Sequence, residues 1–263
     1  MKRLLVLAWI FVAVFVSATW AQTGLRVVDI PTRPGVTQRI LLLSPENPKA
    51  AIVLFPGGHG GLQISPEGRF KWGEGNFVVR TRAMFAAQGL LVAVVDAPSD
   101  RQSPPYLNRF RQTPEHVADI KAVIGWLKQQ ARVPVWLVGT SRGTQSAAFI
   151  ATQLAPADGG PDGLVLTSTI LSDDKARPVS DMELNKIVVP VLVVHHKRDG
   201  CKHCAYADVP RLMDKLSAAP RKELITFDGG QSRGDPCEAM AYHGFNGIEK
   251  DVVARIAQWI ESK

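Results

Sequence analysis

Short runs of consecutive apolar residues, separated by stretches with helical spacing, are the dominant pattern along this chain. A continuous apolar run of about four to eight residues is typical of a strand that is buried on both faces of a parallel sheet. Such runs occupy residues 51–55, 90–95, 135–138, 163–167 and 188–195, and a further strand is expected at 223–227. Alternating or β-branched apolar residues predict two edge strands of a starting hairpin, at 25–30 and 39–43, with a turn over Pro31 to Gly35.

Between these runs, apolar residues recur at the spacing of helices. The pair Thr113-Pro114 is a helix start signal, a polar cap followed by proline in the first turn. The buried face of the helix that begins here is predicted to contain Val117, Ile120, Ile124 and Leu127. Helices are also expected at 77–87, after residue 143, at 210–216 and at 248–260. Strands that alternate with helices predict an α/β domain with a mainly parallel sheet covered on both faces.

Residues 1–21 follow a different pattern. Lys2 and Arg3 precede an apolar stretch from Leu4 to Val16, and small residues then lead to Ala21. This is the pattern of a secretory signal peptide cleaved after Ala21, which predicts an exported protein, periplasmic or secreted, with one domain over residues 22–263. The alternative is an uncleaved membrane anchor, although the run is short for a bilayer. No later stretch approaches spanning length, so no stable membrane insertion is expected after cleavage.

The charge of the chain is basic but dispersed. The formal net charge is +7. Removing Lys2 and Arg3 leaves 7 − 2 = +5 over 263 − 21 = 242 residues, a length that suits one α/β domain. Lys and Arg form no run of four or more, which favours a solvated basic surface and argues against a nucleic-acid partner.

The segment Gly139-Thr140-Ser141-Arg142-Gly143 directly follows an apolar strand and precedes small, helix-tolerant residues. A G-x-S-x-G motif between strand and helix is the nucleophile elbow, a turn so tight that only glycine fits two residues before and after the serine. The alternative is a glycine-rich turn with an incidental serine. Because the motif lies between an apolar strand and a helix, Ser141 is the candidate nucleophile.

Two later segments complete a resemblance to a known family. Asp199 follows the late strand that ends at His195, and His243 lies in Tyr242-His243-Gly244-Phe245, just before the final helix. Over essentially the whole mature chain, this order resembles the α/β-hydrolase superfamily, in which nucleophile, acid and histidine appear in that sequence. The resemblance implies the α/β-hydrolase fold, with helices on both faces of a mostly parallel sheet.

The resemblance also implies a catalytic triad. His243 would take the proton of Ser141, and Asp199 would orient the imidazole. The competing carboxylates are Asp96, Asp173 and Asp174. The competing histidines are His59 in a glycine-rich loop, His116 on a helix surface, His195 and His196 at a strand end, and His203 between two cysteines.

An oxyanion hole is expected from the same resemblance. One donor would be the backbone N–H of Arg142, and the other would come from the loop Pro56-Gly57-Gly58, with Gly58 preferred to Gly57. The chain departs from the family here, because Pro56 stands where many relatives carry histidine.

Arginines recur in the predicted loops and invite a second hypothesis. Gathered at the pocket mouth, they would favour an anionic substrate; dispersed, they would be solvated surface residues. The residues concerned are Arg80, Arg82, Arg101, Arg109, Arg111 and Arg142. The connection over residues 171–186 is too short for a large lid, so the site is expected to be open.

The three cysteines predict one disulfide and one free thiol in an exported protein. If Asp199 and His243 share a hydrogen bond, their loops converge, which favours a Cys201–Cys237 bridge over Cys204–Cys237. Cys201–Cys204 is the remaining pairing. A zinc site from these cysteines and His203 is a further alternative, as is a redox C-x-x-C, although that motif normally opens a helix after an early strand.

Together these features predict an exported serine hydrolase that cleaves a small-molecule carboxylic ester through an acyl-enzyme, with no metal or organic cofactor. A serine peptidase or amidase would use the same triad. A binding module or a thiol-redox protein on the same fold stays possible, because fold alone does not confer chemistry. The sequence leaves the substrate and the oligomeric state open.

Overall fold

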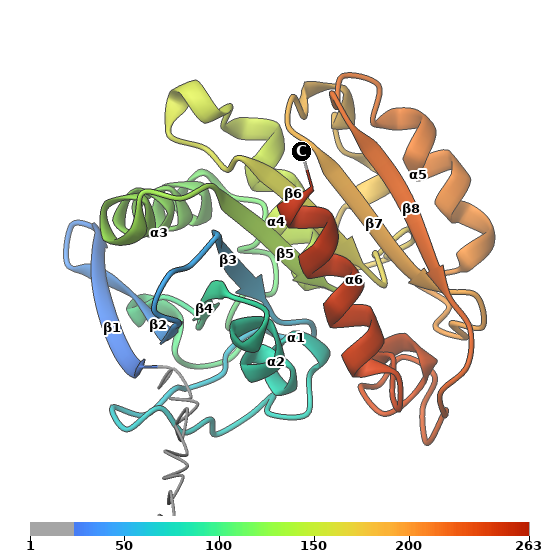
Figure 1. The fold of residues 1–263 in the computed structure, drawn as a ribbon, viewed down its shortest axis with the longest axis horizontal. Coiled ribbons are helices and arrows are strands. Elements are labelled where there is room, and N and C mark those ends of the chain that lie inside the picture. The colour runs from blue at the N-terminus through green and yellow to red at the C-terminus, as the bar shows by residue number, and fades with distance from the viewer. Residues whose placement is uncertain (1–23, 263) are drawn as a thin grey trace, which may run out of the picture.

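An eight-stranded sheet forms the centre of the computed structural model, which describes residues 24–262 (Figure 1). The predicted signal segment, residues 1–21, lies outside the described residues. The strands are β1 Gly24–Arg33, β2 Val36–Ser44, β3 Ala50–Phe55, β4 Leu90–Val95, β5 Val135–Thr140, β6 Gly163–Thr167, β7 Val191–His196 and β8 Lys222–Phe227. Each strand expected from the sequence is present.

The strands lie in the order β1-β2-β4-β3-β5-β6-β7-β8. β2 pairs antiparallel with both β1 and β4, and all other pairs are parallel. The prediction of two edge strands was therefore wrong for β2, which is an inner strand. Its sequence explains this position, because Leu41 and Leu42 are both fully buried and contribute to the cores on opposite faces.

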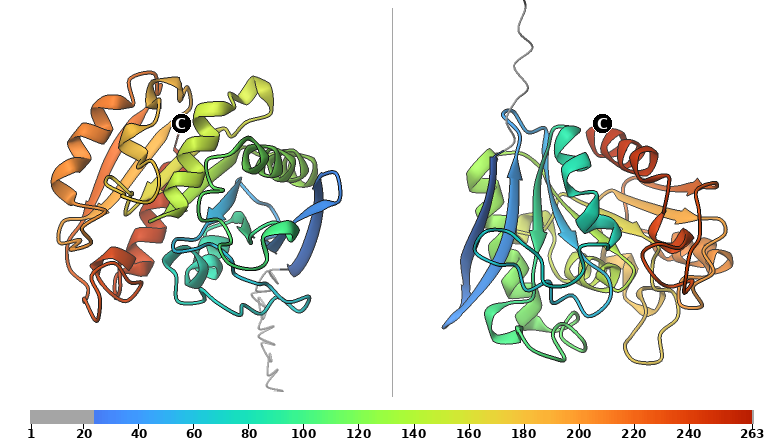
Figure 2. Two further views of the ribbon diagram at one scale, coloured as in Figure 1. Left: turned by 180° about the vertical axis from the view of Figure 1, so that it is seen from behind. Right: turned by 90° about the horizontal axis from the view of Figure 1, so that it is seen from below.

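Helices cover both faces of the sheet. Their bounds are α1 Phe77–Arg80, α2 Arg82–Ala87, α3 Pro114–Ala131, α4 Gly143–Gln153, α5 Val209–Lys215 and α6 Glu249–Glu261. Helices α1, α2 and α6 pack on one face, and α3, α4 and α5 on the other (Figures 1 and 2). Along β3, Val53 belongs to one core and Ile52 to the other, which is why the strand is apolar at every position.

Two details differ from the helices that the sequence predicts. The expected helix over 77–87 is divided at Thr81, whose Oγ1 donates to the carbonyl of Phe77 at 2.7 Å. His116, expected on a helix surface, is only 1% exposed. It precedes Ile120 by four residues, so it lies on the buried stripe of α3, where its ring meets Phe55 and Phe110 edge-on.

The connection between β6 and β7 is partly buried. It contains two 3₁₀ turns, Val179–Asp181 and Leu184–Lys186, and the apolar side chains of Val179, Met182 and Leu184 are buried in the core. The segment therefore packs against the domain and does not form a large lid.

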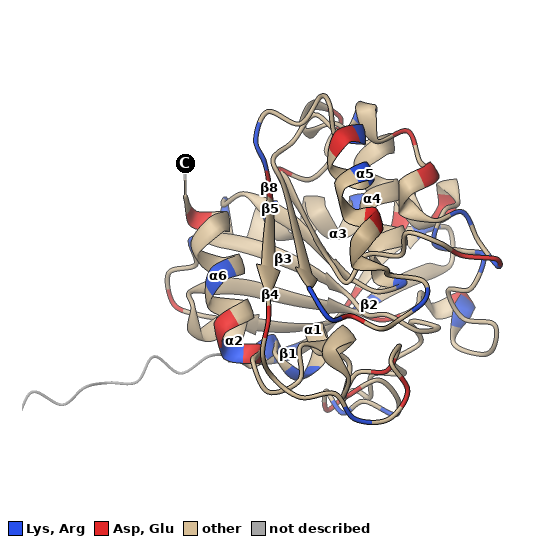
Figure 3. Cartoon of the chain, turned by 90° about the vertical axis from the view of Figure 1, so that its right-hand side faces the viewer, with Lys and Arg blue, Asp and Glu red and all other residues tan. Residues whose placement is uncertain are grey.

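Charged residues lie mainly on helices and loops, with both signs interspersed (Figure 3). The inner strands β3, β4, β5 and β6 carry none. Among residues 24–262, no helix has the length and apolar character needed to cross a membrane.

The parallel strands all end at one edge of the sheet. Ser141 follows β5, the loop with Gly57 and Gly58 follows β3, and Asp199 follows β7. In sheets of this kind, ligands bind beyond the carboxyl ends of the strands. A functional site is therefore expected at this edge.

Candidate active site

Ser141 occupies a tight turn between β5 and α4. Its backbone is in the left-handed region, with φ of 51°, which is uncommon for a residue other than glycine. The turn is fixed on both sides, since the N–H of Ser141 donates to the carbonyl of Thr167 at 3.1 Å and its own carbonyl accepts from the N–H of Thr144 at 2.9 Å. The neighbouring structure thus holds a conformation that the serine alone would not prefer.

The glycines of the motif are required by close approach of other backbone atoms. A Cβ on Gly139 would lie 2.6 Å from the carbonyl oxygen of Gly143. A Cβ on Gly143 would collide with the carbonyl oxygen of Phe55 at the end of β3. Both obstacles are backbone atoms that cannot move aside. The spacing G-x-S-x-G is therefore a steric consequence of this strand–turn–helix geometry.

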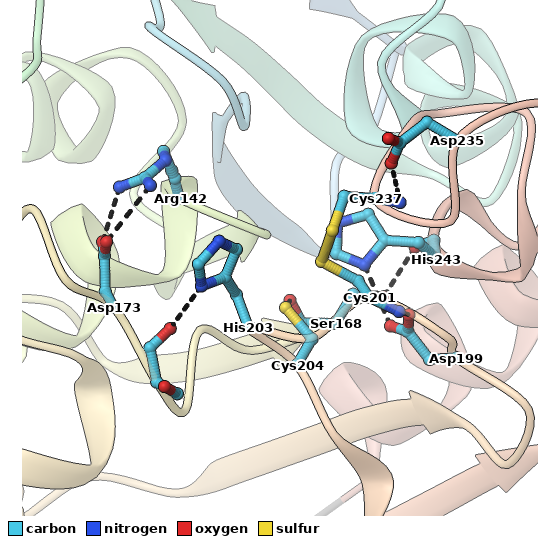
Figure 4. Close-up of a disulfide and its surroundings, with 11 residues drawn as sticks. Arg142, Ser168, Asp173, Asp199, Cys201, His203, Cys204, Asp235, Cys237 and His243 are labelled. Atoms are coloured by element: carbon cyan, nitrogen blue, oxygen red, sulfur yellow. Dashed lines mark hydrogen bonds and ion pairs between the residues drawn. A yellow bond between two sulfur atoms is a disulfide. The ribbon is translucent and has the colours of Figure 1, made fainter.

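His243 and Asp199 form a buried hydrogen-bonded pair (Figure 4). Nδ1 of His243 lies 2.9 Å from Oδ2 of Asp199, and the two residues are 4% and 8% exposed. The other carboxylate oxygen, Oδ1, accepts from the N–H of Cys201 at 2.9 Å. Because a carboxylate only accepts, the proton of the imidazole is assigned to Nδ1, and Nε2 keeps its lone pair.

Nε2 of His243 is buried and has no hydrogen-bond partner within residues 24–262. His243 lines the same cavity as Ser141: a pocket of about 380 Å³ is bordered by Ser141, His243, Gly58, Arg142 and Trp72, among others. A proton acceptor without a partner and a serine hydroxyl therefore border one pocket, as general-base activation of a serine requires.

The loop after β3 brings backbone donors to the same pocket. Gly57 lies so close to the elbow that a Cβ there would be 3.0 Å from Cβ of Ser141. Gly58 has φ of 56°, and a Cβ on it would be 2.5 Å from the ring of Trp72. In the part of the chain that the structure describes, the N–H groups of Gly58 and Arg142 donate to no protein acceptor. Both are free to bind an oxyanion.

Arg111 and His59 hold this loop in place. The Arg111 guanidinium donates to the carbonyls of Pro56 and Gly58, at 3.0 and 3.2 Å, and to Oγ of Ser146 at 2.9 Å. The ring of His59 stacks between Trp72 and Tyr106, at centroid distances of 3.8 and 4.4 Å.

Of the arginines singled out in the sequence, three border the Ser141 pocket or the cavity beside it: Arg109, Arg111 and Arg142. The other three are engaged elsewhere. Arg80 pairs with Glu249, and Arg82 and Arg101 stack on Phe70 and Phe110, respectively.

The competing carboxylates have other partners. Asp173 forms an ion pair with Arg142 (Figure 4). Burial acts to raise the pKa of Asp173, but hydrogen bonds, chiefly from Arg142, outweigh it and leave the pKa below its ordinary value. Asp96 accepts from the N–H groups of Leu62 and Ile64 and so shapes the loop after β3. Asp174 is exposed. Among these carboxylates, Asp199 alone bonds His243 in the described chain.

The remaining histidines also have structural partners. Nε2 of His195 accepts from the N–H of Thr169 at 2.8 Å. Burial, opposed by Asp199 and aided by His243, lowers the pKa of His195 to about 4. His196 stacks on Tyr242, and Nδ1 of His203 lies 2.9 Å from the carbonyl oxygen of Ser172. The expected structural role of the strand-end histidines agrees with these contacts.

A disulfide joins Cys201 to Cys237, which is the pairing that the sequence favours (Figure 4). It ties the loop that carries Asp199 to the segment that precedes His243. Cys204 is a free, buried thiol; its Sγ donates to the carbonyl of Ser168 at 3.3 Å, and burial raises its pKa.

The zinc hypothesis does not fit this arrangement. Sγ of Cys201, Sγ of Cys204 and a ring nitrogen of His243 lie within 4.8 Å of one another. However, the sulfurs of Cys201 and Cys237 are bonded to each other and cannot act as thiolate ligands.

Some site residues carry no signal in the sequence. Trp72 lies in an irregular segment, yet it borders the Ser141 pocket. Ser168 follows β6, and its Oγ donates to the carbonyl of His243 at 2.7 Å, which fixes the histidine loop. Ser168 and His243 are 75 positions apart in the sequence. Their contact depends on the order of the strands in the sheet, which no local sequence pattern reveals.

The fold is similar to that of several solved structures. No family model and no curated protein matches the chain. Solved structures match over nearly its whole length. An esterase from Pyrococcus furiosus has a TM-score of 0.65 at 14% identity, covering 94% of this chain and 95% of that one. A dienelactone hydrolase from Anabaena variabilis has a TM-score of 0.63 at 13% identity, covering 91% and 97%. An α/β serine hydrolase without lid from Xanthomonas campestris has a TM-score of 0.54 at 15% identity, covering 89% and 96%.

Proposed function

The chain has the α/β-hydrolase fold, and from this premise we propose that it is a serine hydrolase that cleaves carboxylic esters. One observation carries the proposal. Ser141, held in a left-handed turn, borders a pocket together with His243, whose Nδ1 bonds Asp199 and whose Nε2 has no partner within residues 24–262.

The reaction follows from these positions. Nε2 of His243 takes the proton of the Ser141 hydroxyl as Oγ attacks the carbonyl carbon of the ester. The N–H groups of Gly58 and Arg142 bind the resulting oxyanion, and each such donor is worth about 10²- to 10³-fold in rate. Asp199 holds the imidazole in the correct tautomer and stabilises the imidazolium.

The second half of the cycle releases the acid. The imidazolium of His243 gives its proton to the departing alkoxide, which leaves an acyl group on Oγ of Ser141. A water molecule then attacks the acyl carbon and transfers a proton to Nε2 of His243. Collapse of the second tetrahedral intermediate returns this proton to Ser141 and frees the carboxylic acid.

The test is labelling by a fluorophosphonate probe, which reacts with an activated serine. The wild-type chain is expected to be labelled at Ser141, and the Ser141→Ala variant is expected to lose the label. Ser103→Ala is the matched control, because Ser103 is exposed and its hydroxyl makes no hydrogen bond within residues 24–262. A labelled Ser141→Ala, or an unlabelled but folded wild-type chain, would contradict the proposal.

Preference for esters is measured separately. Hydrolysis of 4-nitrophenyl esters of acetate to octanoate is compared with that of aminoacyl 4-nitroanilides. The proposed activity predicts turnover of esters with little or none of the anilides, and the reverse order would assign a peptidase to the same triad.

Export is part of the proposal. Residues 1–21 have the pattern of a cleavable signal, and a Cys201–Cys237 disulfide suits an oxidising compartment. N-terminal sequencing of the protein from fractionated cells is expected to begin at Gln22 in the exported fraction. A chain that begins at Met1 in the cytoplasmic fraction would oppose export.

A further inference from the structure

We propose that the substrate carries an anionic group, a carboxylate or a similar small anion, which binds in a cationic cavity beside the Ser141 pocket. The inference rests on the proposed hydrolase function and adds the class of ester. This cavity, here named the cationic cavity, has a volume of about 810 Å³. Its charged lining consists of Arg109, Arg111, Arg142, Lys175, Arg177 and Asp174.

The cationic cavity adjoins the reacting serine. Gly58 and Arg142 line both it and the Ser141 pocket. These two residues also supply the proposed oxyanion donors. The cationic cavity therefore lies next to the Ser141 pocket, within reach of a substituent of an ester whose carbonyl lies at Ser141.

Positive charge in the cationic cavity is largely uncompensated. Five cationic side chains against one acidic side chain give 5 − 1 = +4 for the lining. Of the five, only Arg142 takes part in an ion pair within the described residues, with Asp173. A concave, cationic surface attracts anions and raises their local concentration.

Arg111 gives the strongest indication that the cavity binds an anion. It is 4% exposed, its three hydrogen-bond acceptors are two carbonyls and a hydroxyl, and its Nε has no partner within residues 24–262. Burial, aided by Arg142, lowers its pKa to about 9, so it still carries its charge at neutral pH. A buried cation without a counterion is costly to maintain, and a bound carboxylate would supply the missing negative charge.

The cations at the rim are placed to receive the same anion. Arg177 is held by Gln112, whose amide donates to the Arg177 carbonyl at 2.8 Å and accepts from its guanidinium at 3.1 Å. Arg109 and Lys175 are exposed, and their side chains make no ion pair or hydrogen bond in the described chain. Their positive charge is therefore available to a ligand, and their removal leaves internal contacts intact.

The test compares ester pairs that differ in charge. If the anion is on the acyl side, 4-nitrophenyl hydrogen glutarate is the better substrate compared with 4-nitrophenyl pentanoate, which has the same number of acyl carbons. If it is on the leaving group, 4-acetoxybenzoate is preferred to 4-acetoxybenzamide. We expect a preference of about tenfold or more in kcat/KM in one arm, the gain from one charge-assisted hydrogen bond.

Variants of the cavity lining test whether the preference for anionic esters comes from the cationic cavity. The double variant Arg109→Gln/Lys175→Gln is expected to reduce the anionic-to-neutral ratio of kcat/KM by about tenfold. Lys121→Gln/Lys250→Gln is the matched control, since both lysines are exposed, on α3 and α6, and lie outside the cavity lining. This control also removes two positive charges and should keep the ratio. Equal rates for both members of each pair, or an undiminished ratio in the double variant, overturns the proposal.

A binding measurement separates this proposal from the hydrolase function. Glutarate and its neutral analogue glutaramide are titrated calorimetrically into the wild-type chain and the double variant. Binding of glutarate alone, weakened in the double variant, supports the cationic cavity even if no ester is cleaved and Ser141 is not labelled, in which case the proposed function fails. Labelling of Ser141 without glutarate binding and without an anionic preference retains the hydrolase and rejects the anion site.

Discussion

Two buried histidines predict that stability falls as the pH is lowered from 8 to 5. Burial, with Arg111 and Arg33 adding to it, lowers the pKa of His116 to about 3. Burial also lowers the pKa of His195 to about 4. Both are neutral in the folded chain over this range, whereas in the unfolded chain they take up a proton below pH 6.5 or so.

The sign and the size of the change in stability with pH follow from this difference in proton uptake. The unfolded state binds more protons between the unfolded pKa and the folded one, so stability is complete above about pH 6.5 and is lost as the pH falls toward 4 and 3. With these pKa values, each histidine lowers the free energy of unfolding by about 2 kcal/mol at pH 5 relative to pH 8. The sum, about 4 kcal/mol, is a large part of the roughly 5–15 kcal/mol that stabilises a typical domain.

The assay is urea unfolding at pH 8, 7, 6 and 5, with wild type compared with His116→Leu. Both ring nitrogens of His116 lack hydrogen-bond partners within residues 24–262, so leucine removes the titration without breaking a bond. The decrease in the free energy of unfolding between pH 8 and pH 5 should be smaller by about 2 kcal/mol in this variant than in wild type. Val123→Ala, a buried change on α3 that does not titrate, should lower stability equally at every pH. A flat wild-type profile, or an equal drop in His116→Leu, would refute the reasoning.

Three further predictions concern the site. Asp199→Asn should lower kcat for ester hydrolysis by about 10⁴-fold through loss of the correct His243 tautomer, and a loss under tenfold in a steady-state assay would oppose the triad. Gly143→Ala places a Cβ against the Phe55 carbonyl and should destabilise the chain by about 1–3 kcal/mol or more; an unchanged melting temperature would contradict the steric account. Replacing both Cys201 and Cys237 by serine opens a link with a sequence separation of 36 and should cost about 4 kcal/mol in urea unfolding. In that case, equal stability of the double variant and wild type would show that the bridge contributes nothing.

Much of the fold could be predicted because its causes are local. A strand with both faces buried must be apolar at each position, so β3, β4 and β5 are visible as continuous runs. Thr113 is the N-cap of α3, and its Oγ1 accepts from the N–H of His116 at 3.3 Å, as its position before Pro114 indicates. The glycines around Ser141 reflect backbone approach within one strand–turn–helix unit.

Other features could not be predicted because their causes lie far apart in the chain. β2 is an inner strand because β4 pairs with it, and the chain pattern alone did not distinguish it from an edge. Arg111 and Arg101 are similar arginines in one irregular segment, yet one is buried under the loop after β3 and the other stacks on Phe110 at the surface.

By itself, the sequence determined the αβ alternation and the elbow at Ser141, since both follow from the steric and hydrophobic demands of short segments. Asp199 and His243 were singled out by the resemblance of their chain order to that of the α/β-hydrolase superfamily. Only the tertiary structure decided that Asp199, among four carboxylates, bonds His243, that His116 is buried, and that a cavity beside the Ser141 pocket is lined by five cations, four of which form no ion pair within residues 24–262. These depend on strand order and on packing between distant loops, which fix distances that no local pattern encodes.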